Sequence, residues 1–325
     1  MKAFVTGAAS PLGRALIHLL RKRGDVVMGQ VRRRSGVEIV RKLGAHPVVT
    51  DLTRPRVLAD AMADCTVVYH LAHYFDFWAP ETRVFDAVNV DGTTNTLAAA
   101  VVAHVKRVVF CSSAATIGEL PGHWGHENTQ HRGYTFTEYE RSMVAAERMA
   151  TEIRAAGIEV VVVNPGIIIA PGDPGWTGRM LSDTISGRRR FATTAPIGWV
   201  SVHDAALGLV RAAERGQDGA RYIVSGETLS PRQLLSYVAK LVGRPRPYAV
   251  PRPAILGSAA ISSALAATVN RRPGLSLDEA RFATQGFRVD GTQVCLALGM
   301  EYTPITRWLP PMVESYKTAM TRFDE

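Results

Sequence analysis

Apolar and polar residues follow two alternating patterns in the first half of the chain. Short valine-rich runs, typical of strands buried on both faces, are separated by segments with apolar residues at helical spacing. Strict alternation of strand and helix predicts an α/β fold, a Rossmann-type doubly wound parallel sheet. The predicted strands are Ala3–Val5, Asp25–Val31, His46–Thr50, Thr66–Leu71, Arg107–Ser112 and Glu159–Asn164. The predicted helices start at Pro11 and also cover Gly36–Leu43, Val57–Met62, Thr82–Val102 and Tyr134–Ala156.

The turn after the first predicted strand carries most of a dinucleotide-binding fingerprint. Gly7 and Gly13 are its outer glycines, which let the backbone turn sharply and let helix pack on strand. Ser10 replaces the middle glycine and takes space near a pyrophosphate. Ser10 followed by Pro11 is nevertheless a good N-cap and first helical residue, so Leu12 and its neighbours still begin a helix whose positive end faces an anion.

The alternation ends after Pro165, where a Gly- and Pro-rich stretch follows at residues 166–175. We predict a dinucleotide-binding domain mainly in residues 1–165, with its core completed by about residues 200–225. Two segments, Val200–Arg215 and Arg221–Val224, are expected to return to that core. Residues 166–325 are predicted to be mainly a smaller, substrate-binding region.

The charge pattern points to a phosphate-bearing cofactor and not to nucleic acid. The chain of 325 residues has a formal net charge of +9, but its cations are spread out and not interleaved with aromatics. Arg32, Arg33 and Arg34 fall where NAD-binding proteins carry an acidic residue for the ribose hydroxyls. An arginine there suits a 2′-phosphate, which favours NADP over NAD. The alternative is a solvated basic loop, which is also the expectation for Arg188–Arg190.

Localisation is predicted from cysteine usage and hydropathy. Cys65, Cys111 and Cys295 are scattered without metal-ligand spacing, and Met1 leads directly into the first strand, so we expect a cytoplasmic protein without a signal peptide. The apolar segment Ala254–Val269 is too short to span a bilayer and is interrupted by glycine and serine. A core or surface helix is expected there, and membrane contact stays an alternative.

Eight motifs in register resemble those of one enzyme family. The chain resembles the extended short-chain dehydrogenases/reductases, the NAD(P)-dependent epimerase/dehydratase group, and within it dihydroflavonol-reductase-like and hopanoid-associated sugar-epimerase-like members. The motifs are Thr6-Gly7-x-x-Ser10-x-x-Gly13, Asp51-Leu52, His70-Leu71-Ala72, Asn89-Val90-x-Gly92-Thr93-x-Asn95, Ser112-Ser113, Tyr139 with Ser142 and Glu147, Asn164-Pro165-Gly166 and Val202-His203-Asp204.

The resemblance implies roles for individual residues. Ser113 would hydrogen-bond a substrate carbonyl or hydroxyl, and Tyr139 would exchange its proton. The implied cofactor contacts are Asp51 and Leu52 at the adenine, Leu71 and Ala72 along the dinucleotide, Pro165 and Gly166 at the nicotinamide, and Asn89. The family also often forms a homodimer through two long helices, here Thr82–Val102 and Tyr134–Ala156.

One position departs from the family in a way that bears on the chemistry. The family has a lysine four residues after the tyrosine, and here that position is Met143. A phenol has a pKa near 10, so it needs a nearby cation to act as a base at neutral pH. Arg141, two positions along the helix, points to nearly the opposite side. We therefore expect Tyr139 to be a weak base and a good acid.

The sequence contains two further sets of candidate functional residues. His73, with the aromatic residues Tyr74 to Trp78, follows the fourth strand and is predicted to line the substrate site; His73 is a candidate proton-transfer group, or part of an ordinary packed loop. His123, His126 and His131 have no acidic partner at ligand spacing, so no metal is expected.

Three functions are compatible with the sequence. The first is an NADP-dependent oxidoreductase or epimerase acting on a carbonyl or hydroxyl of a small metabolite. Met143 raises the alternatives of a non-redox lyase, isomerase or cyclase on the same scaffold, and of a non-catalytic cofactor-binding protein.

Overall fold

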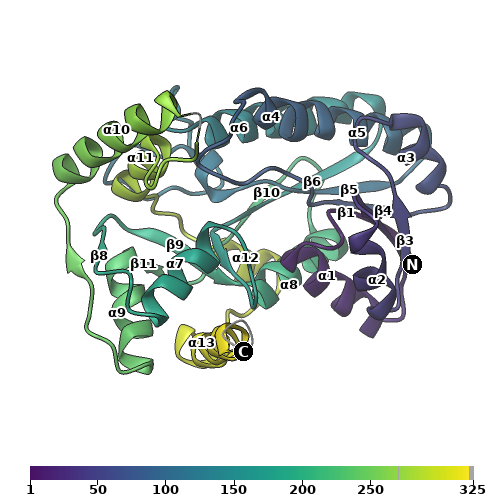
Figure 1. Cartoon of the computed structure of the whole chain (residues 1–325). Coiled ribbons are helices and arrows are strands. Elements are labelled where there is room, and N and C mark those ends of the chain that lie inside the picture. Colours follow the sequence, from purple (N-terminus) through teal and green to yellow (C-terminus); the bar gives the residue numbers. More distant parts are fainter. Residues whose placement is uncertain (270, 322–325) are drawn as a thin grey trace.

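The centre of the molecule is a sheet of seven parallel strands with the order β10-β6-β5-β4-β1-β2-β3 (Figure 1). The computed structural model describes residues 1–269 and 271–321. The parallel α/β sheet expected from the alternation is therefore confirmed, including the return of Arg221–Val224. The strands are β1 (Lys2–Thr6), β2 (Val26–Val31), β3 (His46–Val49), β4 (Val67–His70), β5 (Arg107–Cys111), β6 (Glu159–Pro165) and β10 (Arg221–Val224).

Helices cover both faces of this sheet, in two layers that Figure 1 shows above and below the strands. Because side chains alternate between the faces of a strand, Val109 and Cys111 of β5 pack in one cluster while Val108 and Phe110 pack in another. The first cluster contains α1 (Pro11–Lys22), α2 (Ser35–Lys42), α8 (Val202–Arg215) and α12 (Thr292–Leu298). The second contains α3 (Pro55–Ala61), α5 (Gly92–Val102) and α6 (Glu138–Glu152).

Two predicted helices differ from those observed. The segment Thr82–Val102 is helical but not uniform, since a π-helical stretch, η1 (Asp86–Asp91), separates α4 (Arg83–Phe85) from α5. Such stretches are frequent at functional sites, and the side chains that cause them are not apparent in an apolar pattern. The helix predicted from Tyr134 begins four residues later, because the side chain of Thr137 caps it by accepting a hydrogen bond from the Glu140 amide; its last turn is η3 (Ile153–Ala156).

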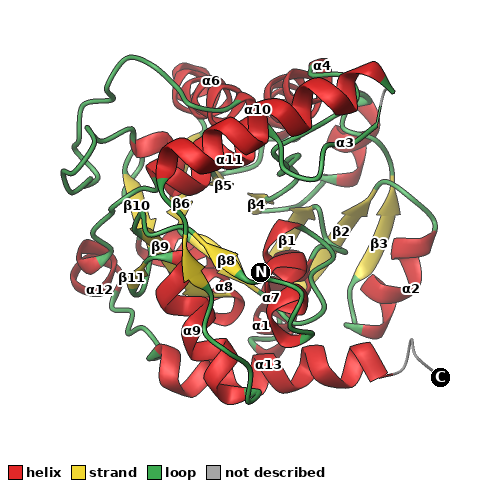
Figure 2. Cartoon of the chain, turned by 60° about the vertical axis from the view of Figure 1, so that its left-hand side comes forward, coloured by secondary structure: helices red, strands yellow, loops and turns green. Residues whose placement is uncertain are grey.

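The second half of the chain adds two small sheets and a helical layer beside the carboxyl end of the main sheet (Figure 2). A third apolar cluster, which includes Trp199, packs most of these elements together. The strands are β7 (Ile167–Ile169), β8 (Phe191–Ala192), β9 (Ile197–Ser201), β11 (Thr228–Leu229) and β12 (Tyr248–Ala249). The helices are α7 (Trp176–Ile185), α9 (Pro231–Leu241), α10 (Arg252–Thr268), α11 (Leu277–Gln285) and α13 (Ile305–Thr321), and a 3-10 turn, η2 (Ala114–Ile117), follows β5. Among the described residues, no helix has the length and apolar character needed to cross a membrane.

Candidate active site

The turn between β1 and α1 has the conformation that its glycines require. Gly7 has φ +65°, and a side chain there would press on the backbone of Ala72. A Cβ atom on Gly13 would lie 2.4 Å from the carbonyl oxygen of Gly7. Ser10 caps α1, because its Oγ accepts a hydrogen bond of 3.0 Å from the Gly13 amide. The tight strand-turn-helix geometry therefore survives the loss of the middle glycine.

Buried polar residues behind the turn hold its neighbours in place. The Thr6 hydroxyl accepts hydrogen bonds from the amides of Leu71 and Ala72, at 3.0 and 3.1 Å. Its proton is then free to point to Nδ1 of His70, 2.8 Å away, so that Nε2 of this histidine carries the hydrogen toward Thr93. Burial lowers the pKa of His70 to about 3, which keeps the ring neutral. This network fixes the backbone that follows β4.

A cavity of about 490 Å³ extends from the turn along the ends of β2 and β3. Its charged lining groups are Arg32, Arg33 and Asp51. Leu52 and Ala72 supply apolar walls, and the side chain of Gln30 lies below, where it accepts from the Gly7 amide and donates to the Thr50 carbonyl. The helix start, the backbone amides of the turn and two arginines fit the diphosphate and the ribose of a dinucleotide. We call this the cofactor cavity.

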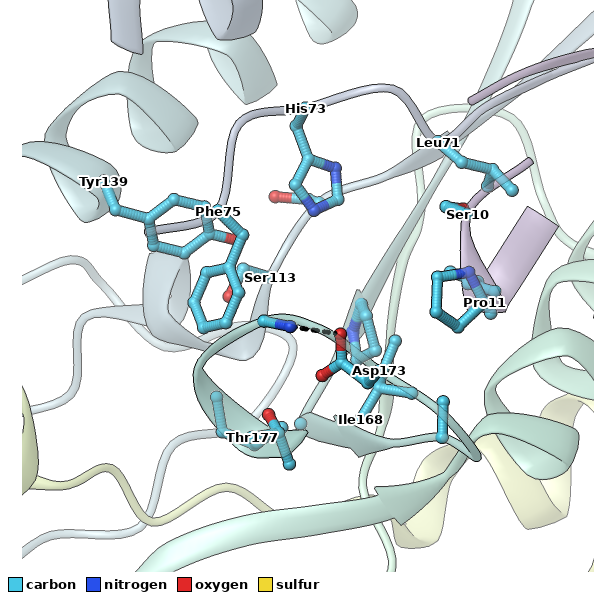
Figure 3. Close-up of a pocket in the computed structure, with 17 residues that line it drawn as sticks. Ser10, Pro11, Leu71, His73, Phe75, Ser113, Tyr139, Ile168, Asp173 and Thr177 are labelled. Carbon is cyan, nitrogen blue, oxygen red and sulfur yellow. Dashed lines mark hydrogen bonds between the residues drawn. The ribbon is translucent and has the colours of Figure 1, made fainter. Parts of the chain in front are cut away.

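A second cavity, of about 270 Å³, lies beside it (Figure 3). The two cavities share Ser10, Leu71 and His73, so they meet at the end of β4. Ser113 and Tyr139 lie on one side of this second cavity, opposite Asp173 and Thr177 in the close-up. Among the described residues that line it, none is a lysine or an arginine. We call this the substrate cavity.

Tyr139 lies in the first turn of α6, next to Ser113 at the end of β5. The tyrosine side chain is 4% exposed. Burial raises the pKa of its phenol above the ordinary value of 10, and a hydrogen bond with Ser113 only partly opposes this effect. Tyr139 is therefore a neutral phenol at physiological pH, able to donate a proton.

Met143 does not line either cavity. It is fully buried, in the apolar cluster that also contains Tyr139, Ala146 and Phe85. Arg141, on the same helix, forms ion pairs with Asp86 and Glu138. No cation is among the groups that shift the pKa of Tyr139 within the described residues. Position 143 is thus part of the apolar core and places no charge near the phenol.

The loop after β4 forms an aromatic wall. Phe75 packs edge-on against Tyr139, with ring centroids 4.8 Å apart, and the ring of His73 lies 6.2 Å from the same tyrosine. Burial lowers the pKa of His73 to about 4, so this imidazole is also neutral at physiological pH. Phe77 continues the wall through edge-on contact with Trp176.

A buried carboxylate supports the floor of the substrate cavity. Oε2 of Glu147, on α6, accepts hydrogen bonds from Ser112, Thr116 and Asn164, at 2.5, 2.6 and 2.9 Å, and its other oxygen pairs with Arg221. These bonds join α6 to the ends of β5 and β6. They fix the distance between Tyr139 and the strand end that carries Ser113.

Most of the residues expected at the site do line it. Ser113, Tyr139, Pro11, Leu12, Pro165 and Gly166 line the substrate cavity, Gly7, Arg32, Arg33, Asp51, Leu52 and Ala72 line the cofactor cavity, and Ser10, Leu71 and His73 line both. Gly13, Asn89 and Met143 line neither. Asn89 is buried, and its amide bonds the backbone of Tyr74 and the hydroxyl of Ser142 instead.

Several lining residues have no counterpart among the sequence-based expectations. Asp173 and Thr177 come from the turn-rich stretch after β6, where the carboxylate of Asp173 accepts from the Gly175 amide at 2.8 Å (Figure 3). Ile167, Ile168 and Ala170 add apolar walls. The glycines and prolines of this stretch mark a turn, but give no indication of which strand end the turn faces. Among the described residues, no group of three or more His, Cys, Asp or Glu is placed to hold a metal ion.

The chain is similar to several known proteins over most of its length. A model of the NAD-dependent epimerase/dehydratase family matches residues 3–225. The chain is 30% identical over 306 residues to sterol demethylase protein B of Methylococcus capsulatus, which covers 92% of this chain and 93% of that protein. It is 28% identical over 323 residues to a Synechocystis protein named, provisionally, a dihydroflavonol 4-reductase, which covers 97% and 94%. The crystal structure of gox2253 superposes with a TM-score of 0.83 at 26% identity, and covers 98% of each chain.

Proposed function

Because the chain belongs to the NAD-dependent epimerase/dehydratase family, as its motifs predicted, we propose that it is an NADPH-dependent reductase of a carbonyl in an apolar small molecule. Its relatives establish it as an enzyme of the oxidoreductase and epimerase group. They give no support to the alternatives of a non-redox enzyme or a non-catalytic binding protein. The observation that carries the proposal is the Tyr139–Ser113 pair in a cavity that meets the cofactor cavity at Ser10, Leu71 and His73.

The preference for NADP is supported by the charge of the cofactor cavity. Arg32 and Arg33 both line it, next to Gly36 at the start of α2. Two guanidinium groups there would bind the 2′-phosphate of NADP, and would leave the free ribose hydroxyls of NAD without a carboxylate partner. Asp51 and Leu52 would contact the adenine end, as the family resemblance implies.

The chemistry follows from the protonation state of Tyr139. When bound, NADPH supplies a hydride for the carbonyl carbon. Ser113 donates a hydrogen bond to the carbonyl oxygen, and Tyr139 transfers its phenolic proton to that oxygen as the alcohol forms. Solvent then returns a proton to Tyr139, so the balance is one hydride and one proton for each hydroxyl produced.

The same protonation state favours reduction over oxidation. Oxidation of an alcohol requires Tyr139 to be a phenolate that accepts a proton. Burial raises the pKa of the Tyr139 phenol, so little of it is phenolate at neutral pH. Met143 provides no positive charge to offset that burial. An enzyme with this site would therefore be a better reductase than dehydrogenase near neutral pH.

The lining of the substrate cavity supports an apolar substrate. Phe75, Ile167 and Ile168 line the cavity together with Tyr139, and the arginines of the 188–190 run do not line it. A nucleotide sugar carries a diphosphate that needs cations, whereas a carbonyl on an apolar ring or chain does not. The name of the Methylococcus relative, which refers to a sterol, points to the same class of substrate.

The sequence predicted that one part of the chain binds the cofactor and another part binds the substrate, and this assignment is part of the proposal. All residues that line the cofactor cavity lie between Gly7 and Val88, and residues 166–177 contribute one wall of the substrate cavity. We propose that residues 1–165, with the core completed near 200–225, bind NADP, and that residues 166–325 mainly serve the substrate. A homodimer through α5 and α6 stays a prediction.

Isotope transfer tests the proposed reaction directly. The protein is incubated with NADPH that carries deuterium at the transferred position and with a panel of ketones and aldehydes, including sterol ketones and aromatic ketones. Mass spectrometry should find deuterium on the carbinol carbon of at least one product. Tight binding of NADPH without deuterium transfer to any member of the panel would contradict the proposal.

A further inference from the structure

Helix α10 presents an apolar face to solvent. The sequence contains no charged residue between Arg252 and Arg271. Ile261 and Leu265 lie one turn apart and are each 65% exposed, and Val269 follows at 61%. Figures 1 and 2 both show α10 on the outside of the molecule, packed on α11. A surface helix normally carries charged residues on its outer face, and this one does not.

The orientation of α10 is fixed by its polar residues. Ala259 is fully buried, and Oγ of Ser262 accepts a hydrogen bond from the Leu275 amide at the start of α11. Ser262 therefore faces the protein, as does Ile255, which lines a cavity beneath the helix, while Ile261 and Leu265 face outward. Large aliphatic side chains without charged neighbours are not expected on the outer face of a helix in contact with water.

Two exposed aromatic rings extend the apolar surface. Phe191 and Tyr248 are 59% and 68% exposed, and pair across β8 and β12 with ring centroids 6.3 Å apart. The chain passes from β12 directly into α10, and Phe191 lines a cavity together with Ala254 and Ile255 of that helix. We call Phe191, Tyr248, Ile261, Leu265 and Val269 the α10 patch.

Arginines lie close in the sequence to the residues of this patch. Arg190 precedes Phe191, Arg246 lies two residues before Tyr248, Arg252 begins α10 and Arg271 follows it; all four are exposed, and none is in an ion pair found within the described part of the chain. Nearby acidic residues are already engaged: Asp76 pairs with Arg272, and Asp183 pairs with Arg188. The exposed apolar residues of the patch thus have unpaired arginines as neighbours in the sequence.

We infer that the α10 patch docks on the surface of an anionic lipid bilayer. Aliphatic and aromatic side chains that enter the interface, with arginines that reach the phosphate headgroups, are the features that hold a helix in the plane of a membrane. A second copy of the chain would bring the same four unpaired arginines together at the contact, which disfavours a self-complementary dimer through this face.

The cavity beneath α10 fits the same location. Its volume is about 500 Å³, and apolar side chains such as Met180, Val250 and Ile255 dominate its lining. Trp176 forms part of the wall and lies between Gly175 and Thr177, which line the substrate cavity. Docking through the α10 patch would place this apolar cavity next to the lipid.

Vesicle sedimentation tests the inference without any turnover, so its outcome is independent of the proposed reaction. The full chain is mixed with vesicles of phosphatidylcholine alone, or of equal parts phosphatidylcholine and phosphatidylglycerol. We expect binding to the anionic vesicles that is about tenfold stronger than binding to the neutral ones, and that weakens with added salt. Absence of binding to both vesicles would overturn the inference.

Variants of the patch locate the contact. Ile261→Glu with Leu265→Glu should weaken binding at least about tenfold. The matched control, Val102→Glu with Leu296→Glu, changes exposed aliphatic residues on α5 and α12 and should leave binding unchanged. Ile261→Gln with Leu265→Gln provides a second patch variant without added charge. Equal binding by the patch variants and the control, with unchanged unfolding midpoints, would contradict docking through α10.

Two further results discriminate between lipid and protein as the occupant. Arg252→Glu with Arg271→Glu should remove most of the preference for phosphatidylglycerol. Sedimentation velocity without vesicles should show that the patch variants and the unaltered protein have the same mass. A dimer that only the patch variants dissociate would assign the face to a second copy and overturn the inference.

Discussion

The two cavities of the site differ in how they use charge. The cofactor cavity has Arg32, Arg33 and Asp51 in its lining, whereas the substrate cavity has no cation among its described lining residues. In the substrate cavity, burial keeps Tyr139 and His73 neutral. In the proposed function, the charged side would recognise an anionic cofactor, while the other side provides neutral donors and apolar walls.

The largest expected effect comes from removing the proton donor on the substrate side. Tyr139→Phe should lower kcat for carbonyl reduction by about 10²- to 10⁴-fold, because in the proposed reaction only the Tyr139 phenol gives a proton to the carbonyl oxygen. The affinity for NADPH, measured by fluorescence titration, should stay within about twofold of the unaltered protein.

Tyr134 offers a matched control for that loss. It lies outside both cavities and its side chain is 49% exposed. Tyr134→Phe should therefore leave reduction unchanged. If both tyrosine variants retain full activity, the proton comes from another group, and the role assigned to Tyr139 is wrong.

The next effect tests the charged side of the comparison. Arg32→Ala with Arg33→Ala should weaken NADPH binding by roughly 10²- to 10⁴-fold, since each of the two charged hydrogen bonds to a phosphate contributes roughly 1.5–3 kcal/mol. NADH binding should change little. Arg34→Ala is the control from the same run, because Arg34 does not line the cavity. An equal loss for NADPH and NADH would show that these arginines do not recognise the 2′-phosphate.

Placing a cation on the neutral side should reduce the difference between the cavities. Met143→Lys should raise the rate of alcohol oxidation at neutral pH about tenfold, because an ammonium near the phenol lowers the pKa of Tyr139. The variant should also lower the unfolding midpoint, since position 143 is fully buried. Met143→Leu should change neither the rate of alcohol oxidation nor the unfolding midpoint in this way. An unchanged rate of alcohol oxidation in Met143→Lys would argue against the protonation of Tyr139 as the step that limits oxidation at neutral pH.

A smaller effect concerns His70, which helps to fix the backbone after β4, where the two cavities meet. His70 has an unfolded pKa near 6.5 and a folded pKa lowered to about 3, so the unfolded chain binds the extra proton first as pH falls. Its contribution to stability is complete above pH 6.5 and decreases from there toward the folded pKa. Between pH 7 and pH 5, urea unfolding should show about 1–2 kcal/mol more loss for the unaltered protein than for His70→Asn. Equal pH dependence in the two proteins would exclude His70 as the responsible group.

The fold could be predicted from the sequence because the apolar pattern is strong where strands are buried on both faces. All five later strands of the first half begin or end within a residue or two of the predicted positions. The boundaries that differ have local causes: the Thr137 cap moves the start of α6, and the π-helical stretch η1 interrupts the predicted helix 82–102. Neither cause changes the apolar spacing, so the pattern could not reveal them.

The site was only partly predictable. Ser113, expected from the family resemblance, and His73, expected because it follows the fourth strand, both line the substrate cavity, since parallel strands bring their carboxyl ends to one edge of the sheet. Asp173 and Thr177 were missed, because their place depends on how residues 166–177 fold back over β6. Asn89 was expected at the cofactor, but its side chain is satisfied by Tyr74 and Ser142. Contacts of this kind depend on tertiary packing and not on local spacing.

The protonation state of Tyr139 is the central claim, and ultraviolet titration of tyrosinate measures it without any substrate. The difference in absorbance between the unaltered protein and Tyr139→Phe is followed as pH rises, while circular dichroism reports that both proteins stay folded. We expect no tyrosinate signal from Tyr139 up to at least pH 10, because burial without a cation raises the pKa of its phenol above that of a free phenol. A signal from Tyr139 that titrates near pH 7 would contradict the account.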